Sequence, residues 1–487
     1  MEQKILETRE EFNKIIEFVS GEAVGREIHQ VEGEIFRMLL RLGRVLLELF
    51  LSAVGTGNVG QTVTAADGSV MQYRRDAPRQ YLSIFGVITI VRAYYLKEGG
   101  KGIFPLESWL NLPKRKYSYL LQKWMILSGV RTTYEAAAQW MEEIFGLELA
   151  HRPIQRVTHD LSPAVEEFND SLETPEFKEE GPILIETFDR KGIPMCKPDS
   201  DQPRTADKPG KKKMAMVTAT LSVDPYERPP AEEIVEGLLH QGDKKPRPKK
   251  TRRAKHHHKR IIASLKEETA TVMNKAQEAA MSRIHENTRL KAVVCDGEKS
   301  LWKAADDRFP GWIQILDVMH VMDKLWFAAH IYHKEESPEA KEYVRERALA
   351  LLEGEVDDII EDFTISLDDG SLSRPKAHAL KHKVLGYFLT NRDRMKYDEY
   401  LAAGLPIGSG VIEGTCKNLI NDRMERSGMR WSPEGAEAIL KLRAVYLSDL
   451  WNNFWDFTTQ REKKILYGEQ ISIMKQPPYQ DHVLKAA

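Results

Sequence analysis

The sequence predicts an α/β protein, in which strands followed by helices build a sheet that is covered on both faces. Three observations support this class. Apolar strand-like runs end in an acidic residue and lead into helix-like runs at 289–305 and again at 311–333. A further apolar run at 182–195 precedes another strand-like run at 211–224. Alternation of strands with helices is typical of sheets with helices on both faces.

The composition excludes several classes of protein. The chain has 487 residues, of which 42% are hydrophobic and 30% charged, so a packed core is expected and a wholly disordered chain is excluded. No run of about 18 uncharged apolar residues occurs, which excludes a membrane-spanning helix. Only three cysteines are present, far apart, and the first residues lack an apolar core; both features favour a cytoplasmic protein without a signal peptide. The net charge of −2 does not by itself indicate a nucleic-acid binder.

The N-terminal third is predicted to be mostly helical. Apolar residues at three- and four-residue steps predict helices over 1–53. The run GTGNVG at 55–60 matches the letters of a dinucleotide-binding fingerprint, but that fingerprint needs a strand before it and a helix after it. Here a helix precedes it and the β-rich stretch 81–95 follows, so we reject this match. Residues 106–134 are predicted to be helical again.

Residues 134–162 predict two helices separated by a short turn at Gly146, which suits a helix-turn-helix. The second helix would present Arg152, Gln155 and Arg156 to phosphates and base edges of DNA. The alternative is a helical hairpin that only packs on its neighbours.

The middle of the chain alternates between strands, helices and polar segments. Residues 182–195 predict a strand that ends at Asp189, then a tight turn and a second short strand. Residues 334–400 are charged and predicted to be helical, with no strand signal. The tail after Lys463 is predicted to be loosely held.

One segment is strongly basic. Residues 244–260 hold ten Lys or Arg, three His and no acidic residue. We interpret it as an exposed loop that follows a phosphate backbone, and the alternative is a solvated linker without a specific partner. The side chains that we expect on DNA are Lys249, Lys250, Arg252 and Arg253.

Acidic residues at strand ends predict a metal site. Asp189 and Asp296 both follow apolar runs, and strand ends of an α/β sheet bring side chains to one edge. Two carboxylates placed together repel each other, and a cation relieves that repulsion. Mg²⁺ prefers oxygen ligands and keeps positions open for substrate phosphate. Convergent acids near a basic loop therefore suggest metal-assisted phosphodiester chemistry, although each acid alone could simply cap a turn.

Several strings in the second half of the chain resemble a known family in the family's own order. They are FDRKGIPM (188–195), GKKKMAMVTATLSVDPYERPPAEEIVEGL (210–238), VCDGEKSLW (294–302), ILDVMHVMDKLWFAA (315–329) and LPIGSGVIEGTCKNLINDRMERSGMRWSPEGAEAILKLRA (405–444). On these strings the chain resembles the DDE transposases of bacterial insertion sequences, in particular the ISKra type, and more remotely the Mutator-like elements.

The resemblance implies an RNase H-like catalytic domain with a large α-helical insertion, preceded by a mostly helical N-terminal DNA-binding region. The implied organisation is a helical region at 1–72, a β-hairpin with a helix-turn-helix at 73–175, the catalytic domain at 176–333 and 401–460, the insertion at 334–400, and a tail at 461–487.

The resemblance also implies the site. It assigns a catalytic, metal-binding triad to Asp189, Asp296 and Glu413, with Asp317 and His320 of the DVMH string in a supporting role. Relatives usually carry Gly after the first aspartate, whereas this chain has Arg190, which keeps Glu186 as an alternative to Asp189. Relatives also often carry a cysteine pair after a YY pair. YYLKEGGKG (94–102) has none, so their small zinc site is expected to be missing.

Glu413 is predicted to begin a helix, where the helix dipole favours a carboxylate. The face that follows offers basic side chains suited to DNA phosphates. These are Lys417, Arg423, Arg426 and Arg430.

The implied function is that of a transposase, which binds the terminal repeats of its element and cleaves and joins DNA strands. Two Mg²⁺ or Mn²⁺ ions about 3.5–4 Å apart would serve this chemistry. The expected partners are terminal-repeat DNA, target DNA and further copies of the chain, as a homodimer or a larger synaptic assembly in the cytoplasm, on the nucleoid. Two alternatives stay open: an RNase H-like nuclease that cuts without joining, and a domesticated DNA-binding protein without catalysis.

Overall fold

The computed structural model describes residues 1–64, 68–97, 99–100, 102–196, 212–226, 229–239 and 256–471. The chain forms two compact units. The first contains residues 1–168 together with those from Asn452 onward, and the second contains residues 169–451. Within the described ranges, no helix is both long and apolar enough to cross a membrane.

The first unit begins with a helical hairpin, as the apolar periodicity predicted. α1 (Glu2–Glu17) continues into a π-helical turn (Phe18–Glu22), and α2 (Ile28–Val54) runs back along it. Lys4 of α1 binds Glu48 of α2 at 2.8 Å, which fixes how the two antiparallel helices align. Few apolar side chains of this hairpin are buried, namely Ile15, Phe18, Ala23 and Val45.

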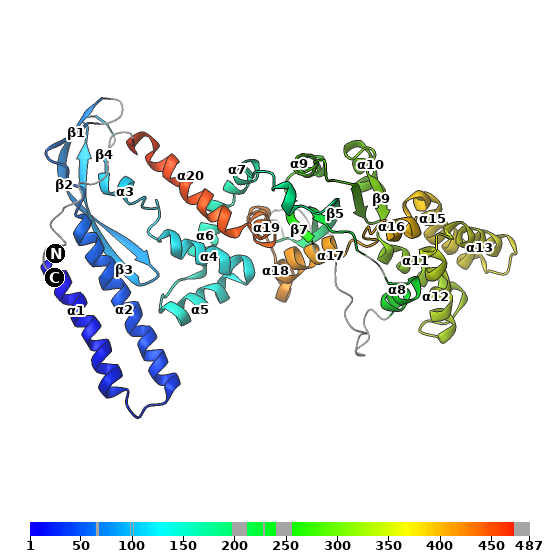
Figure 1. Cartoon of the computed structure of the whole chain (residues 1–487), viewed down its shortest axis with the longest axis horizontal. Coiled ribbons are helices and arrows are strands. Elements are labelled where there is room, and N and C mark those ends of the chain that lie inside the picture. Colours follow the sequence, from blue (N-terminus) through cyan, green and yellow to red (C-terminus); the bar gives the residue numbers. More distant parts are fainter. Residues whose placement is uncertain are drawn as a thin grey trace, which may run out of the picture. The chain divides into compact units, whose positions relative to one another are not determined.

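An antiparallel sheet with the order β1-β2-β3-β4 follows (Figure 1). Its strands are β1 (Thr62–Thr64), β2 (Val70–Ser83), β3 (Gly86–Leu96) and β4 (Gly102–Ile103). The predicted β-rich stretch is therefore a long hairpin of β2 and β3, with a register shift at Tyr73/Arg75. The buried hydroxyl of Tyr95 donates to the carbonyl of Gly60 at 2.9 Å and so holds the glycine-rich run against the sheet.

The remaining helices of the first unit are α3 (Pro105–Trp109), α4 (Tyr119–Arg131), α5 (Tyr134–Phe145), α6 (His151–Leu161), α7 (Ala164–Asp170) and α20 (Trp451–Ile471). The two helices and the turn predicted at 134–162 are confirmed. Thr133 caps α5 by accepting the N–H of Ala136, and Gly146 ends it with φ +65°, a conformation that favours glycine. α20 continues through Ile471, so the tail predicted after Lys463 begins as helix.

The second unit is built on a mixed five-stranded sheet in the order β7-β6-β5-β8-β9. The strands are β5 (Ile183–Pro194), β6 (Lys212–Val223), β7 (His256–Ser264), β8 (Leu290–Cys295) and β9 (Ile313–Leu316). β5, β6 and β7 pair antiparallel, whereas β8 and β9 run parallel to β5. The sheet with its helices confirms the predicted α/β class.

Helices pack around this sheet (Figure 1). They are α8 (Ala231–Leu239), α9 (Thr269–Met281), α10 (Lys299–Arg308), α11 (Val318–Tyr332), α17 (Gly410–Cys416), α18 (Asp422–Met424) and α19 (Pro433–Leu447), with a 3₁₀ turn at Phe177–Glu179. β8 and β9 each lead into a helix after one acidic strand-end residue, as predicted. The helix that Glu413 is predicted to begin is interrupted by a π-helical turn (Lys417–Asn421) and a 3₁₀ turn (Arg426–Gly428).

Residues 334–400 form a helical excursion, as predicted. It comprises α12 (Pro338–Leu352), α13 (Val356–Asp368), α14 (Arg374–Ala379), a π-helical stretch (Leu380–Leu385), α15 (Gly386–Asn391), a 3₁₀ turn (Arg392–Arg394) and α16 (Tyr397–Ala402). Its buried residues, such as Phe363 and Phe388, belong to the same continuous core as Phe188 of the sheet. The excursion is therefore packed on the sheet and is not a separate lobe.

Two local predictions are wrong. The tight turn expected after Asp189 does not exist, because β5 stays paired with β6 in unbroken register from Ile183 to Pro194, with Gly192 opposite Met214. The last residues of the basic run, His256 to Arg260, are not an exposed loop. They form the start of β7, because β6 offers a free edge on which this segment pairs.

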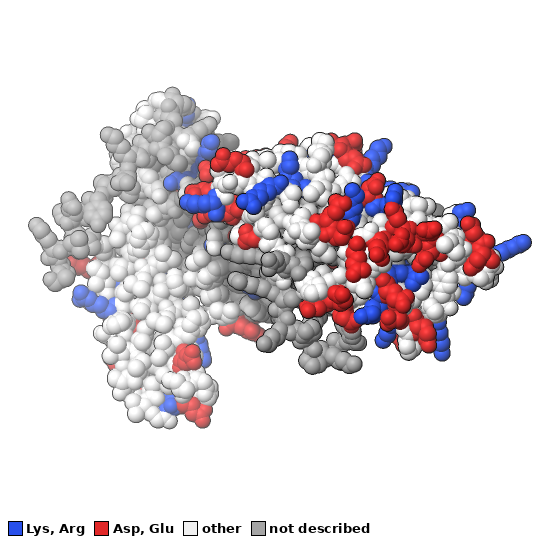
Figure 2. Space-filling model, turned by 45° about the vertical axis from the view of Figure 1, so that its right-hand side comes forward, with Lys and Arg blue, Asp and Glu red and all other residues white. Residues whose placement is uncertain are grey.

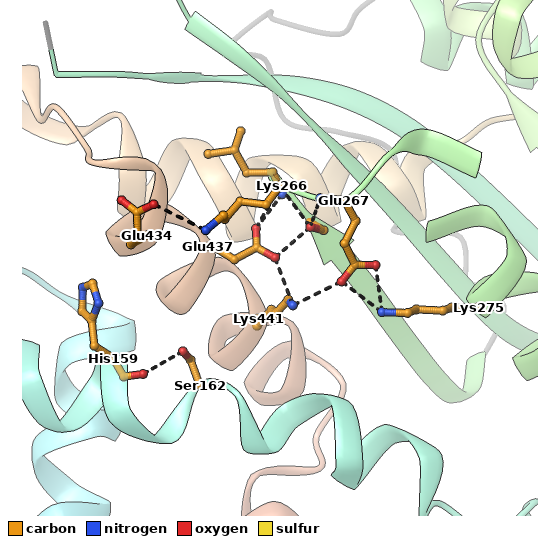
Figure 3. A network of polar contacts seen from close by, with 10 residues as sticks. His159, Ser162, Lys266, Glu267, Lys275, Glu434, Glu437 and Lys441 are labelled. Atoms are coloured by element: carbon orange, nitrogen blue, oxygen red, sulfur yellow. Dashed lines mark hydrogen bonds and ion pairs between the residues drawn. The ribbon is translucent and has the colours of Figure 1, made fainter. Parts of the chain in front are cut away.

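A polar network ties α19 to the end of β7 (Figure 3). The Glu437 carboxylate accepts the hydroxyl of Ser264 and the N–H of Leu265, both at 2.7 Å. Lys441 lies 3.1 Å from Glu437 and 3.2 Å from Glu267. This network fixes the helix that follows the Glu413 segment against the sheet.

Candidate active site

Three aspartates lie side by side at one edge of the sheet. β8 lies between β5 and β9, and the residues that precede the aspartates are paired in register, Phe188 with Cys295 and Cys295 with Leu316. Asp189, Asp296 and Asp317 therefore occupy equivalent positions on three neighbouring strands, which are about 4.8 Å apart in a sheet. β8 and β9 end here, whereas β5 continues, so Asp189 is inside its strand and not at its end as predicted.

Burial raises the pKa of two carboxyls at this edge, those of Asp296 and Glu413. Loss of hydration raises the pKa of Asp296, and the nearby charge of Asp189 raises it further. The pKa of Glu413 is also raised, first by loss of hydration and then by the charge of Asp317. The charge of His320 opposes both shifts. Carboxyls in this situation are stabilised by a bound cation.

Asp317 is fully buried and is already occupied by hydrogen bonds. Its Oδ1 accepts the N–H of Met319 at 2.7 Å, which caps α11. Its Oδ2 accepts the N–H of Ser409 at 3.0 Å and the Ser409 hydroxyl. Asp317 therefore fixes the loop from which α17 begins, and through it the position of Glu413.

Glu413 lies in the first turn of α17, as predicted, and its side chain is exposed. Single ligand atoms of Asp317, His320 and Glu413 lie within 4.8 Å of one another. The charge of Asp189 also acts on Glu413. The structure thus brings Asp317 and His320, the predicted supporting residues, together with Glu413.

The donor chemistry fits a hard divalent cation. Carboxylate oxygens suit Mg²⁺ or Mn²⁺, whereas imidazole suits softer metals. Three of the roughly four lone-pair sites of Asp317 already accept hydrogen bonds. Asp189 and Asp296 each accept one backbone N–H, from Arg190 at 2.6 Å and from Glu298 at 3.0 Å. Asp189 and Asp296 therefore accept fewer of these hydrogen bonds than Asp317 does. Among the described residues, however, the group whose ligand atoms converge within 4.8 Å is Asp317, His320 and Glu413, and it includes neither of these two aspartates.

Glu186, the alternative to Asp189, lies inside the sheet. It is 0% exposed and accepts the Thr220 hydroxyl at 2.6 Å. Burial raises its pKa to about 8. Opposite Val293 in the register, it lies three residues below the row of aspartates, which favours Asp189 as the residue at the edge.

Arg190 has a role that the sequence did not indicate. Its guanidinium binds Glu298, just before α10, at 2.7 Å, and the Thr269 hydroxyl at the start of α9 at 3.2 Å. Arg190 thus links β5 to the two helices beside it.

A groove of about 630 Å³ adjoins the aspartates, and the sequence did not predict it. Its lining includes Lys299 of α10, Lys324 of α11, and Lys383 and Tyr387 of the helical excursion. It also includes Gly297, where a Cβ would lie 2.3 Å from the Tyr387 ring, so only glycine fits beside Asp296. No sequence signal predicts this groove, because its lysines come from separate helices and only tertiary packing brings them together.

Three of the side chains predicted to contact DNA lie on α6. Arg152, Gln155 and Arg156 are exposed on one face of α6, opposite buried Ile154 and Val157. This exposed face is the one that the helix-turn-helix interpretation requires.

In the α17–α18 segment, Lys417, Arg426 and Arg430 are exposed, and Arg426 binds Asp422 at 2.6 Å. Arg423 was expected on this exposed face, but it is 1% exposed and lies over the Trp431 ring. The helix is interrupted just before it, which turns this side chain inward. Lys249, Lys250, Arg252 and Arg253 lie outside the described residues.

Comparisons with known proteins find little. No protein-family model matches the chain, and no curated protein matches it. Among solved structures, the chain is similar to the Drosophila P element transposase strand transfer complex, with a TM-score of 0.24 and 10% sequence identity. That match covers 73% of this chain and 86% of the other chain.

Proposed function

We propose that the protein is a transposase of a bacterial insertion sequence, which binds the ends of its element and cleaves and joins DNA strands. The proposed catalytic residues are Asp189, Asp296 and Glu413, in an RNase H-like domain. The observation that carries the proposal is the placement of Asp189 and Asp296 on adjacent parallel strands with Glu413 beside them. The sheet order, with three antiparallel strands followed by two parallel ones, supports the proposed fold.

The carboxylates of the triad would hold Mg²⁺ or Mn²⁺, because those of Asp296 and Glu413 are partly dehydrated and the charge of Asp189 acts on both. When bound, the cation would polarise the scissile phosphate and activate the attacking hydroxyl. Asp317 positions the Glu413 loop through Ser409 and does not need to touch the substrate.

Charged side chains near the site suit a DNA strand. The groove lined by Lys299, Lys324 and Lys383, here called the lysine groove, would neutralise phosphates next to the reacting bond. Lysine binds phosphate mainly through its charge. The exposed face of α6 would read the terminal repeats. Two copies of the chain would associate when they bind the paired ends of the element.

The decisive experiment follows cleavage and joining separately. Asp296→Asn should lower metal-dependent cleavage of element-end DNA at least about 100-fold while DNA binding is retained. Asp307→Asn, on the exposed face of α10, is the matched control and should keep activity. Joined products from pre-cleaved ends support a transposase, whereas hydrolysis alone supports a nuclease that cuts without joining. Equal cleavage by Asp296→Asn and the wild type would refute the proposed site.

Metal binding by the free protein tests which side chains are ligands. Titration with Mn²⁺, followed by electron paramagnetic resonance, should show weaker binding in Asp189→Asn and little change in His320→Gln. The opposite result would assign the metal to Asp317, His320 and Glu413 in place of the triad.

A further inference from the structure

The first unit contains a cavity whose lining is rich in positive charge, here called the arginine pocket. Its volume of about 380 Å³ lies within the roughly 300–1,000 Å³ of pockets that hold small ligands. Its charged lining consists of Arg79 of β2, Arg92 of β3, Glu107 of α3 and Lys114. Glu107 is the only acid among the described residues that line it, so the lining carries a net charge of +2.

The pairing of β2 with β3 places the two arginines on the same face of the sheet. Arg79 is opposite Ile90, and Arg92 is opposite Ala77, two residues from Arg79. Residues opposite each other in antiparallel strands share a face, and so do residues two apart in one strand. Ile90 on that face is 2% exposed and packs against Leu106 of α3. The two positive charges therefore lie next to apolar core, where water stabilises them little.

Both arginines bind the same carboxylate. Arg79 and Arg92 each donate to one oxygen, Oε1 of Glu107. Arg79 also donates to the carbonyls of Pro113 and Arg115, the latter at 2.8 Å. Because carbonyls carry no net charge, the carboxylate offsets only one of the two positive charges.

Arg92 keeps hydrogen-bond donors for a ligand. It is 8% exposed, and a guanidinium carries five N–H donors. Within the described part of the chain, only its Nη1 has a hydrogen-bond partner, and its buried Nε has none. Its Cζ lies 4.1 Å from the centroid of the Phe104 ring, and this stacking restricts the guanidinium plane. A buried donor without a partner is unfavourable, so an anion in the pocket would stabilise this side chain.

The surface of the second unit differs from this pocket. Basic and acidic side chains are interspersed over the part of it that Figure 2 shows, and charges at a surface are also hydrated. In the arginine pocket the cations outnumber the acid, and Arg92 is buried. A bound anion relieves this situation.

The chemistry of the lining favours phosphate. The planar fork of a guanidinium matches phosphate oxygens, and hydrogen bonds between the two are charge-assisted. A phosphate monoester carries a charge of about −1.5 to −2 at pH 7, which balances the +2 of the lining.

We propose that the arginine pocket binds a doubly charged phosphate group, held by Arg79 and Arg92 with Lys114 nearby. Glu107 orients the two arginines and limits the anionic charge that the pocket accepts. Such a group is present in inorganic phosphate, in small phosphate monoesters and at the phosphorylated 5′ end of a DNA strand. This binding does not depend on the proposed catalytic function.

Calorimetric titration of the full chain with inorganic phosphate, at constant ionic strength, tests the pocket. The wild type should bind one phosphate per chain, and Arg92→Met should bind it at least about 10-fold more weakly, because charge-assisted hydrogen bonds are lost. Arg74→Met, at an exposed arginine of β2, is the matched control and should bind as the wild type does. A wild type without saturable binding at about 10 mM, well above a millimolar dissociation constant, overturns the proposal. So does equal affinity in Arg92→Met and the wild type, or equal weakening in Arg74→Met.

Glu107→Gln tests the pocket in the opposite direction. It should tighten phosphate binding about 10-fold, because it removes the negative charge beside the ligand. In chloride its melting temperature should fall below that of the wild type, since both arginines lose their carboxylate, and added phosphate should restore it. Phosphate that restores nothing would show that the four side chains form a structural ion cluster only, which overturns the proposal.

Competition by oligonucleotides identifies the source of the phosphate. If a 5′-phosphorylated strand displaces inorganic phosphate and its 5′-hydroxyl form does not, the group belongs to a DNA end. If neither form displaces it, the ligand is a small phosphate. Equal displacement by both forms would point to the singly charged phosphates of the DNA backbone and overturn the doubly charged ligand.

Discussion

Glu186 carries a carboxyl group in the interior of the sheet, and its ionisation should be measurable as a dependence of stability on pH. Its side chain is 0% exposed, and among the described residues its Oε1 has no hydrogen-bond partner. Burial raises its pKa to about 8 from the usual 4.5. The charged form is therefore disfavoured in the folded protein, and the group stays protonated near neutral pH.

The sign and size of the effect follow from the two pKa values. Between pH 4.5 and pH 8 the unfolded chain has lost this proton while the folded chain keeps it. Unfolding then releases a proton, so this group's contribution to the free energy of unfolding falls as pH rises, by about 1.4 kcal/mol per pH unit. From pH 5 to pH 8 the loss is about 3.5 kcal/mol. Glu186→Gln cannot ionise and should remove this loss, so the variant gains stability relative to the wild type as pH rises.

Urea unfolding between pH 5 and pH 8, followed by tryptophan fluorescence, measures this difference. The matched control is Glu278→Gln on the exposed face of α9, which should keep the pH dependence of the wild type. If Glu186→Gln and the wild type lose stability in parallel over this range, the carboxyl is not held neutral in the sheet and the reasoning fails.

Three further changes probe the site and its support. Ser409→Ala removes one donor from buried Asp317 and should lower the free energy of unfolding by about 1–3 kcal/mol, with cleavage reduced as the Glu413 loop loosens; equal activity and melting temperature would contradict this. Arg283→Met leaves Glu180 buried without its 2.7 Å partner and should destabilise by about 3–5 kcal/mol in urea unfolding, and added Glu180→Gln should recover part of this; no recovery would speak against an uncompensated charge. Lys383→Gln should lower the slope of log affinity for DNA against log salt by about 0.9, and an unchanged slope would exclude a phosphate contact.

Local patterns predicted those parts of the fold that short-range physics determines. The apolar runs before Asp296 and Asp317 form β8 and β9, and the helices that follow them begin within three residues. Gly146 ends α5 because its positive φ suits glycine. In each of these cases the residues that decide the structure are neighbours in the sequence.

Predictions failed where a distant partner decides the conformation. The basic and histidine-rich start of β7 is a strand because β6 lies beside it, and its own composition carries no strand signal. Likewise, Gly192 resembles a turn residue, but pairing with β6 keeps it extended. The lysine groove and the burial of Arg423 also depend on packing between separate helices. The alignment of Asp189 with Asp296 is a matter of strand register, which sequence spacing alone does not fix.

α11 and the helical excursion together form a segment that leaves the sheet and returns to it at almost the same point. The N–H of Val318, where the chain departs, donates to the carbonyl of Ile407, where it comes back, at 3.0 Å. Downstream, Trp431 exchanges backbone hydrogen bonds with Pro194 and Cys196 at the end of β5. Because Glu413 lies between these two anchor points, its position is independent of how long the excursion is. Doubling a flexible loop costs only about 0.6 kcal/mol in closure entropy, so connections between the excursion's core-packed helices can lengthen without displacing the glutamate.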